Sequence, residues 1–187
     1  MKILMPLAEG FEEIEAITVV DILRRADIEV VVAGLKSGLV EGAHKIKVLP
    51  DVSLGEADPS KFDGIILPGG YPGYVNLGND DRILNITRQM NKAGKWIAAI
   101  CCAPYVLIKA GVLQDRRATI SPSGKAQVAS CAKYSEERVV VDGNLITSQS
   151  PGTAMEFALM LVKVLAREEK LKQIKQQTLA ICKEDFN

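Results

Sequence analysis

The chain has 187 residues, of which 48% are hydrophobic and 25% charged, as in ordinary globular proteins. Its 23 Lys and Arg residues balance its 23 Asp and Glu residues, so its net charge gives no support for a nucleic-acid or anionic-membrane partner. No apolar run is long enough to span a bilayer. Because acidic residues directly follow the short apolar run 3–8, no signal peptide is expected. We therefore expect one cytoplasmic domain over residues 1–187.

Strand-like and helical runs alternate along the chain. Short apolar or β-branched runs predict strands, and longer amphipathic runs predict helices. Single helices between strands imply parallel pairing, so the predicted fold class is α/β, a doubly wound sheet with helices on both faces. Strands are expected over residues 3–7, 28–33, 45–49, 64–67, the run just before Cys101, 139–141 and 145–147, and helices over 12–26, 80–93, 103–110, 151–167 and from 168 onward.

The first predicted helix, over residues 12–26, has an apolar face and an acidic first turn. The face contains Ile14, Ile17, Leu23 and Ala26. Two of the acidic residues, Glu12 and Glu13, fit the pattern of solvated side chains that the helix dipole stabilises.

Cys101 lies where an apolar strand gives way directly to the helix expected over residues 103–110. A side chain at such a corner projects from the carboxyl end of the sheet and lies at the amino end of a helix, where an anion is favoured. We therefore expect a lowered pKa for the Cys101 thiol and take it as the candidate reactive residue. A buried structural cysteine is the alternative, since free cysteine is among the most buried residue types.

Glu15 also follows a predicted strand end, and its carboxyl group could reach a thiol on a neighbouring strand end. Two adjacent anions are unfavourable, so Glu15 is expected to be protonated and to donate a hydrogen bond to the Cys101 thiolate. The alternative is that Glu15 is a solvated residue of the first helical turn, but it alternates with apolar neighbours.

A third strand end carries Gly69 and Gly70. Glycines allow the backbone to approach a ligand closely, and their N–H groups together with that of Cys102 could form an oxyanion hole. A Gly-Gly pair alone is weak evidence, because most such pairs mark turns.

The sequence offers no obvious catalytic base and no cofactor motif. His44 is the only histidine and is expected at the surface or at an interface, while Ser121 and Ser123 supply no base. Neither a dinucleotide fingerprint nor a P-loop is present, and the cysteine spacing matches no zinc pattern, so we expect no cofactor and no metal. The chemistry should then be redox-linked, or use Glu15 and the cysteine itself for proton transfer. The four cysteines are expected to be thiols: Cys101, Cys102, Cys131 and Cys182.

With these residues in view, the chain resembles the ThiJ/PfpI superfamily, and most closely its parkinsonism-associated deglycase branch, which includes the bacterial YajL proteins. The resemblance rests on GFEEIE at residues 10–15, LPGG at 67–70, AAIC at 98–101 followed by Pro104, and TSQSPGT at 147–153. It implies a flavodoxin-like sandwich with a nucleophile elbow, and a homodimer. It also implies that Cys101 is the reactive cysteine, that Glu15 is its protonated partner, and that Cys101 oxidises to a sulfinate.

The same resemblance implies a function in stress protection. Family activities include glutathione-independent glyoxalase, deglycation of glycated adducts, and redox-regulated chaperoning. The first hypothesis is an enzyme acting on a small reactive carbonyl or a glycated adduct. The second is a redox sensor or chaperone without turnover, and the third is a scaffold with an inert elbow.

Several residues depart from the family pattern. Cys102 stands where family proteases carry a histidine, which argues against peptidase activity, and Ser121 replaces a histidine of the stress-response branch. Ser150, beside Pro151, replaces a usual glycine at the rim of the pocket. The dimer-side candidates, which match interface arginines of relatives, are Arg25 and His44.

Overall fold

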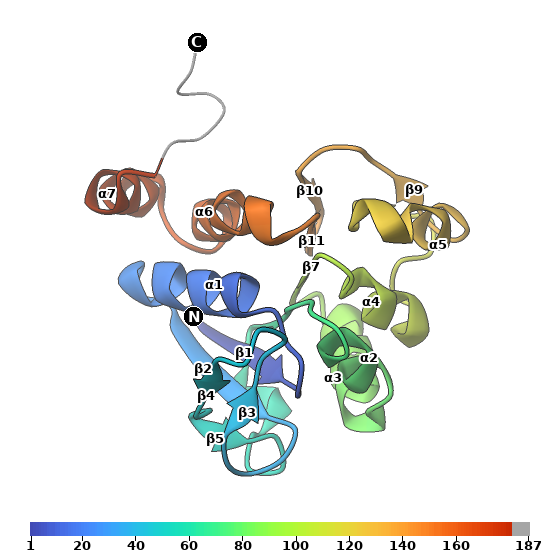
Figure 1. Ribbon diagram of the computed structural model, residues 1–187. Helices are drawn as coiled ribbons and strands as arrows, with labels where there is room; N and C mark the ends of the chain where they lie inside the picture. The colour runs from blue at the N-terminus through green and yellow to red at the C-terminus, as the bar shows by residue number, and fades with distance from the viewer. Residues whose placement is uncertain (181–187) are drawn as a thin grey trace.

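The computed structural model describes residues 1–180, and its centre is a seven-stranded sheet (Figure 1). The strand order is β10-β11-β7-β6-β1-β2-β5. All neighbours pair in parallel except β10 and β11, which form an antiparallel hairpin at one edge. The predicted α/β class with a mostly parallel sheet is confirmed. The strands are β1 (Lys2–Leu7), β2 (Glu29–Gly34), β5 (Val52–Ser53), β6 (Gly64–Leu67), β7 (Trp96–Ile100), β10 (Val139–Asp142) and β11 (Leu145–Ser148).

The parallel strands β2, β1, β6, β7 and β11 follow one another in space as the second, first, third, fourth and fifth strands of a flavodoxin-like sheet. The chain leaves β1 toward β2 and later returns to the other side of β1 as β6. Ligands in such sheets bind beyond the carboxyl ends of the strands at this change of direction. The fold therefore points to the ends of β1, β6 and β7 as the place for a site.

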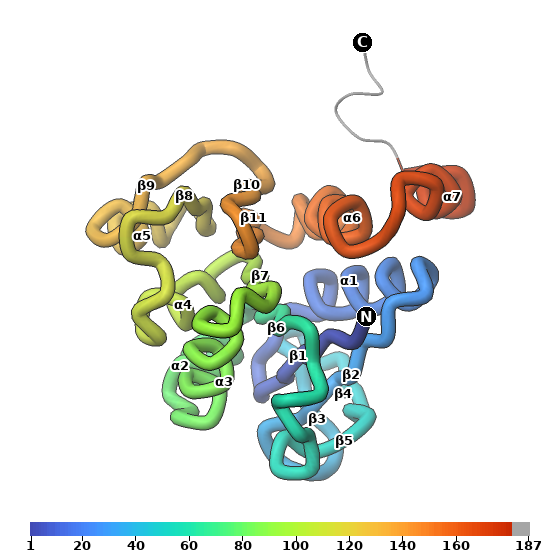
Figure 2. Tube along the Cα trace, turned by 180° about the vertical axis from the view of Figure 1, so that it is seen from behind, coloured from blue at the N-terminus to red at the C-terminus, as the bar shows by residue number. Residues whose placement is uncertain are grey.

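Helices cover both faces of the sheet (Figures 1 and 2). Successive strand residues point to opposite faces. In β1, Ile3 and Met5 join the core cluster beneath α1 and α6, while Leu4 joins the cluster on the opposite face. One face carries α1 (Glu13–Arg25), α6 (Ala154–Leu165) and α7 (Glu168–Thr178), and the other carries α2 (Gly73–Gly78), α3 (Asp81–Lys92), α4 (Pro104–Ala110) and α5 (Lys125–Ala129).

Short elements complete the described residues. Two small ladders lie outside the main sheet, one antiparallel and one parallel. They are β3 (Val40–Glu41) with β4 (Lys47–Val48), and β8 (Arg117–Ala118) with β9 (Lys133–Tyr134), and the 3₁₀ turns are η1 (Pro59–Lys61), η2 (Pro122–Gly124) and η3 (Pro151–Thr153).

The sequence did not predict α2, α5, β5 or the β8–β9 pair, because these elements are too short to show a period. No helix among residues 1–180 is both long and apolar enough to cross a membrane. A single domain over all 187 residues stays a prediction, since residues 181–187 lie outside the description.

The predicted apolar face of α1 is only half right. Leu23 is buried as expected, but Ile14 is 55% exposed and Ile17 is 44% exposed. Ala16 and Val19 instead lie on the stripe with Leu23 that faces the core. Residues 16, 19 and 23 share one helix face, whereas 14, 17 and 21 share another, and the sheet contacts the first.

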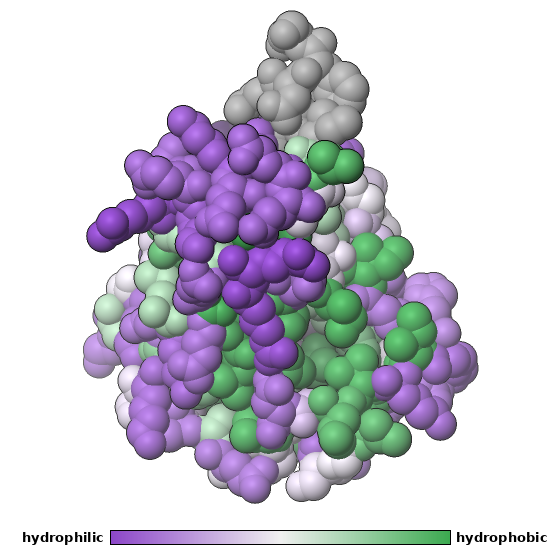
Figure 3. Space-filling model, turned by 90° about the vertical axis from the view of Figure 1, so that its left-hand side faces the viewer, coloured by the Kyte–Doolittle hydropathy of each residue, from purple (hydrophilic) through white to green (hydrophobic). Residues whose placement is uncertain are grey.

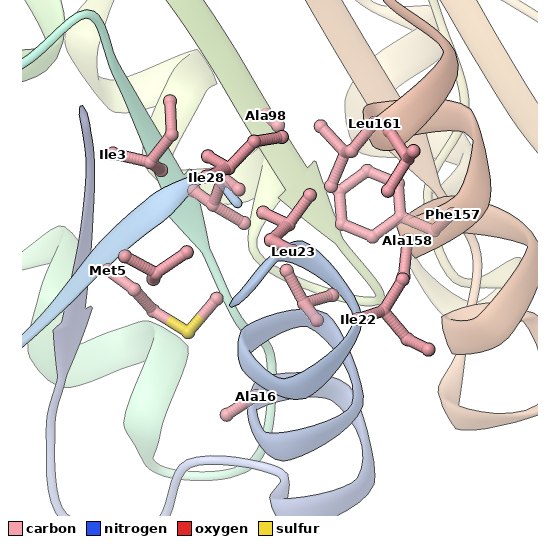
Figure 4. Close-up of a cluster of buried hydrophobic side chains, with 14 of the residues drawn as sticks. Ile3, Met5, Ala16, Ile22, Leu23, Ile28, Ala98, Phe157, Ala158 and Leu161 are labelled. Atoms are coloured by element: carbon pink, nitrogen blue, oxygen red, sulfur yellow. The ribbon is translucent and has the colours of Figure 1, made fainter. Parts of the chain in front are cut away.

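The contact between α1 and α6 forms the centre of one core layer (Figure 4). Ile22 and Leu23 of α1 lie beside Phe157, Ala158 and Leu161 of α6, and all five are almost fully buried. The packing of α6 thus fixes α1, whose first turn carries Glu15.

Replacing Phe157 with alanine should therefore destabilise the protein strongly. Loss of a fully buried ring and the cavity left behind should lower the free energy of unfolding by about 3–5 kcal/mol. Urea denaturation followed by circular dichroism measures the change. Lys163→Ala, on the exposed side of the same helix, is the control and should change stability by about 0.5 kcal/mol or less. Equal losses in both variants would contradict the core assignment.

Candidate functional site

Cys101 occupies a sharp turn between β7 and α4, as the sequence predicted. Its φ is 62°, a left-handed value that non-glycine residues rarely adopt. Its N–H donates to the carbonyl of Ser148 at 3.0 Å, and its own carbonyl accepts from the N–H of Ser121 at 2.9 Å. Hydrogen bonds from both sides thus hold the strained backbone in place and leave the half-buried thiol at the carboxyl edge of the sheet.

Glu15 lies in the first turn of α1 and is completely buried. Its Oε2 accepts the N–H of Gly69 at 2.8 Å, whereas Oε1 has no hydrogen-bond partner among the described residues. Burial raises the pKa of Glu15 to about 7, although the hydrogen bonds from Gly69 and Cys101 act in the opposite direction. The carboxyl group is therefore largely protonated below neutral pH. We assign the proton to Oε1, because Oε2 already accepts a hydrogen bond from Gly69.

The two glycines after β6 allow Glu15 and Cys101 to meet. A Cβ at Gly69 would lie 2.7 Å from both the Cβ of Cys101 and the Oε2 of Glu15. Gly70 has a φ of 92°, and a Cβ there would overlap the backbone N of Glu12, at the start of α1. Only glycine therefore fits at position 69, between Glu15 and Cys101, and at position 70, against the start of α1.

The predicted oxyanion hole is partly wrong. The N–H of Gly69 is taken by Glu15 and is not available to a ligand. Within residues 1–180, the N–H groups of Gly70 and Cys102 donate to no acceptor, so these two donors stay free.

Cys102 takes part in the site more directly than the sequence suggested. The Sγ atoms of Cys101 and Cys102 are 4.0 Å apart, and the Cys101 thiol donates to Cys102. This donation, with further hydrogen bonds from Ser123 and Ser121, lowers the pKa of Cys102 to about 6 in spite of burial. The same donation, together with burial and the negative charge of Glu15, raises the pKa of Cys101. The two thiols therefore ionise as a coupled pair, and the lowered pKa expected for Cys101 stays a prediction.

Two serines and two tyrosines complete the surroundings. Ser121 is brought to the site as predicted, and its hydroxyl lies 3.2 Å from that of Ser123. Tyr74 of α2 packs edge-on against Tyr105 of α4, with ring centroids 5.7 Å apart, and burial and the charge of Cys102 raise the pKa of Tyr74. The sequence analysis missed Tyr74 because it lies in a helix with no detectable period.

Three other predicted site residues make only local contacts among the described residues, and their part in the site stays a prediction. The N–H of Ser150 donates to Thr153 at 3.0 Å at the start of η3, and Pro151 is the first residue of that turn. No hydrogen bond joins either to Cys101 within the described residues. Arg25 pairs with Asp21 at 2.7 Å on the exposed side of α1.

Glu12 and Glu13 are buried, which contradicts the prediction that they are solvated. Glu13 accepts the backbone N–H of His44 at 2.7 Å and also lies 3.0 Å from its Nδ1, and this contact raises the pKa of His44. These three residues are the one group in the described chain with three potential metal ligands close together. Because Glu13 already accepts bonds from His44 and Ile46, we interpret the group as an anchor for the β3–β4 hairpin.

The remaining cysteines lie outside this arrangement. Cys131 is a free thiol after α5, and its sulfur lies 3.9 Å from the carbonyl oxygen of Gln127 and 3.7 Å from that of Val128. Cys182 lies outside the described residues.

Comparison with known proteins identifies the family. A sequence profile of the DJ-1/PfpI family matches residues 1–164. The chain belongs to the DJ-1/PfpI family. It is similar to the Drosophila melanogaster protein DJ-1beta, with 44% identity over 173 residues, covering 91% of this chain and 92% of that protein.

Solved structures of the family have the same fold. The crystal structure of Drosophila DJ-1beta matches with a TM-score of 0.94 and 42% identity, covering 97% of this chain and 98% of that one. Oxidized Toxoplasma gondii DJ-1 matches with a TM-score of 0.92 and 36% identity, covering 97% and 99%. An archaeal relative, Deglycase TK1284 of Thermococcus kodakarensis, is 36% identical over 167 residues, covering 88% of this chain and 99% of its own.

The raised pKa of Glu15 predicts a specific dependence of stability on pH. Between its unfolded value of about 4.5 and its folded value of about 7, the folded state keeps a proton that the unfolded state has lost. The free energy of unfolding should therefore fall as pH rises through this window, by up to about 3 kcal/mol. Glu15→Gln cannot ionise and should remove this fall. Urea unfolding at about pH 5 and about pH 8 measures it.

Glu169→Gln, which changes an exposed carboxyl group on α7, is the matched control and should keep the wild-type dependence. If wild type and Glu15→Gln gave parallel stability curves, Glu15 would ionise as an ordinary carboxyl group.

Proposed function

We propose that this protein is a cysteine-dependent stress-protection enzyme that acts on reactive carbonyls, of the glyoxalase or deglycase type. The observation that carries the proposal is the Glu15 carboxyl group, buried against Cys101 with a pKa of about 7. An acid–base group is most effective when its pKa lies near the working pH. We place the activity in the cytoplasm, because free thiols persist in a reducing compartment.

The residues support a reaction on a small α-oxoaldehyde. The Cys101 sulfur adds to the aldehyde carbon and forms a hemithioacetal. Glu15 takes the hydrogen of that carbon as a proton and returns one to the adjacent carbon, so that the second carbonyl becomes an alcohol and the hemithioacetal becomes a thioester. Water hydrolyses the thioester to a 2-hydroxy acid and frees the Cys101 thiol. We assign the stabilisation of the oxyanions of these steps to the N–H groups of Gly70 and Cys102, which donate to no acceptor among the described residues.

The relatives support the same class of function. The archaeal protein at 36% identity is named a deglycase, and a second archaeal relative at the same identity carries that name too. Deglycation needs the same elements, since a sulfur nucleophile and an acid–base group act on a carbonyl-derived carbon.

A second candidate is a redox sensor or redox-regulated chaperone without turnover. Its support is the half-buried thiol of Cys101, accessible to a small oxidant, and the Toxoplasma relative whose structure is that of an oxidized protein. Sustained turnover by a catalytic amount of protein would exclude this as the sole role.

Cys101→Ala should abolish conversion of methylglyoxal to lactate, because the alanine cannot form the hemithioacetal. Glu15→Gln should lower kcat by at least about 100-fold with a smaller effect on KM, because proton transfer rather than binding is lost. Lactate formation with purified protein is the measurement, and Cys131→Ser, away from the site, is the control. Turnover that persists in Cys101→Ala would overturn the enzyme proposal.

We also propose that the protein is a homodimer. Figure 3 shows a face on which apolar side chains gather in a patch bordered by polar ones. Ile14 and Ile17 of α1 are exposed, and so are Ile46 and Leu49 around β4. Glu13 accepts the N–H of Ile46, which ties the two segments into one surface. Apolar groups of this size are usually covered by a partner, and a second copy would bring His44 and Arg25 to the rim.

Ile17→Glu should convert the dimer to a monomer, because it places a charge within the exposed apolar surface. Sedimentation velocity distinguishes the two states. Gln89→Glu adds the same charge on the exposed side of α3, on the other face of the sheet, and should leave the dimer intact. A monomeric wild-type protein would refute the dimer.

A further inference from the structure

We propose that Tyr74 forms an aromatic subsite beside Cys101, and that this subsite makes aryl α-oxoaldehydes better substrates than methylglyoxal. An aryl α-oxoaldehyde carries an aromatic ring on its second carbonyl carbon, where methylglyoxal carries a methyl group. The inference rests on the carbonyl chemistry proposed above and names the substrate class of the same site. It follows from three tyrosine rings that lie together on α4, on α2 and on the loop before α2.

The ring of Tyr74 lies at the centre of this group. It is 6.4 Å from the ring of Tyr71 and 5.7 Å from that of Tyr105, measured between ring centroids. Tyr71 is 74% exposed, whereas Tyr74 and Tyr105 are half-buried. The three rings thus form a row that leads from solvent to the contact between α2 and α4 (Figure 1).

Backbone hydrogen bonds connect this row to the oxyanion donors. The N–H of Tyr74 donates to the carbonyl of Gly70 at 2.9 Å, and the N–H of Tyr105 donates to the carbonyl of Cys102 at 3.1 Å. Gly70 and Cys102 are the residues whose own N–H groups we assign to the oxyanions of the reaction. A substrate carbonyl bound by these N–H groups therefore lies beside the two rings.

The other surroundings of the thiols are filled or polar. Gly69 and Glu15 leave no space for a substituent next to Cys101, since even a Cβ at Gly69 would lie 2.7 Å from both of them. Hydroxyl groups of η2 contact Cys102. Burial raises the pKa of Tyr74, and the charges of Cys102 and Cys101 raise it further, which agrees with a ring close to both thiols. We therefore place the substituent of the carbonyl on the tyrosine side.

Tyr105 supports the ring of Tyr74 from behind. A Cβ at Gly78 would lie 3.2 Å from the Cε1 of Tyr105, so that this ring packs against the backbone of α2. The ammonium group of Lys109 lies 5.7 Å from the centroid of the same ring and donates to Asn79 at 2.7 Å. The planes of the two tyrosine rings meet at 86°, an edge-on contact that is favourable between aromatic groups. A ring held in this way binds a ligand with little loss of side-chain entropy.

The charges around the rings favour an uncharged aromatic group. A cationic substituent would meet the ammonium group of Lys109 at the Tyr105 ring. An anionic one would be repelled by the thiolate and by the ionised form of Glu15. An uncharged aryl group meets neither penalty, and aromatic rings attract one another beyond what the burial of their area supplies.

The reaction has the same balance for an aryl substrate as for methylglyoxal. The Cys101 sulfur bonds to the aldehyde carbon, and Glu15 moves a proton from that carbon to the next one. Water then cleaves the thioester, which frees the Cys101 thiol and releases a 2-aryl-2-hydroxy acid. One water molecule is consumed, and no oxidant or reductant takes part.

Alkylation of Cys101 tests the subsite without any turnover. Phenacyl bromide and bromoacetone are α-bromoketones that differ only in a phenyl or a methyl group, and the sulfur displaces bromide from each. Mass spectrometry with fragmentation gives the rate constant at Cys101 for each reagent. Their ratio, divided by the same ratio for N-acetylcysteine, is the aryl preference. Since both reagents meet the same thiolate, a change in its pKa cancels in this ratio.

The aryl preference of the wild-type protein should be about 10-fold, and Tyr74→Ala should abolish it. A 10-fold change is ~1.4 kcal/mol, which one aromatic contact can supply. Tyr74→Phe keeps the ring and should keep the preference. Tyr74→Leu keeps an apolar side chain without a ring and should also lower the preference, so it serves as the second variant if alanine loosens α2. Tyr134→Ala, which removes a tyrosine ring from β9, is the matched control and should leave the preference unchanged.

An aryl preference that is absent from wild type, or that survives in Tyr74→Ala, would overturn the proposal. So would its loss in Tyr74→Phe, because the hydroxyl group and not the ring would then be responsible. If the protein formed no hydroxy acid from methylglyoxal or phenylglyoxal while the preference followed Tyr74, the enzyme proposal would fail and the aromatic subsite would stand. Turnover of methylglyoxal together with an unchanged preference in Tyr74→Ala would have the opposite meaning.

Discussion

The site depends on one buried carboxyl group placed next to one thiol. Glu15 has no access to water, and its hydrogen bonds from Gly69 and Cys101 only partly offset the cost of burying a charge. The group therefore keeps its proton up to about neutral pH. Because its pKa is near neutral, Glu15 can donate a proton in its neutral form and take one back in its ionised form, each at little cost, which an ordinary exposed carboxylate cannot do near neutral pH.

The fold creates this pair by bringing three strand ends together. β1 leads into the helix that carries Glu15, β6 leads into Gly69, and β7 leads into Cys101. Gly69 has no side chain, and a side chain at this position would clash with both Glu15 and Cys101. The packing of α1 against α6 then holds Glu15 in place, so the geometry of the site depends on core packing that lies away from it.

Much of the fold and of the candidate site could be predicted from the sequence, because both depend on local residue patterns and on the order of strands and helices. The apolar run that ends at Cys101 indicated the elbow, and the alternation of Glu15 with apolar neighbours indicated burial. The orientation of α1 could not be predicted, since Ile14 and Ala16 are both apolar and only tertiary contact decides which faces the core. The coupled ionisation of the Cys101 and Cys102 thiols could not be predicted either. It depends on hydroxyls from η2, a turn remote in sequence, and on a 4.0 Å contact that sequence does not encode.

A titration of the Glu15 side chain by carbon-13 NMR tests the central claim most directly. The carboxyl carbon of Glu15, assigned by its absence in Glu15→Gln, reports the ionisation of that group alone. The account predicts a midpoint near pH 7, well above those of the exposed glutamates. A midpoint at or below the ordinary glutamate value of about 4.3 would contradict it. Glu15 would then be an anion at neutral pH, and the site would lack its neutral acid.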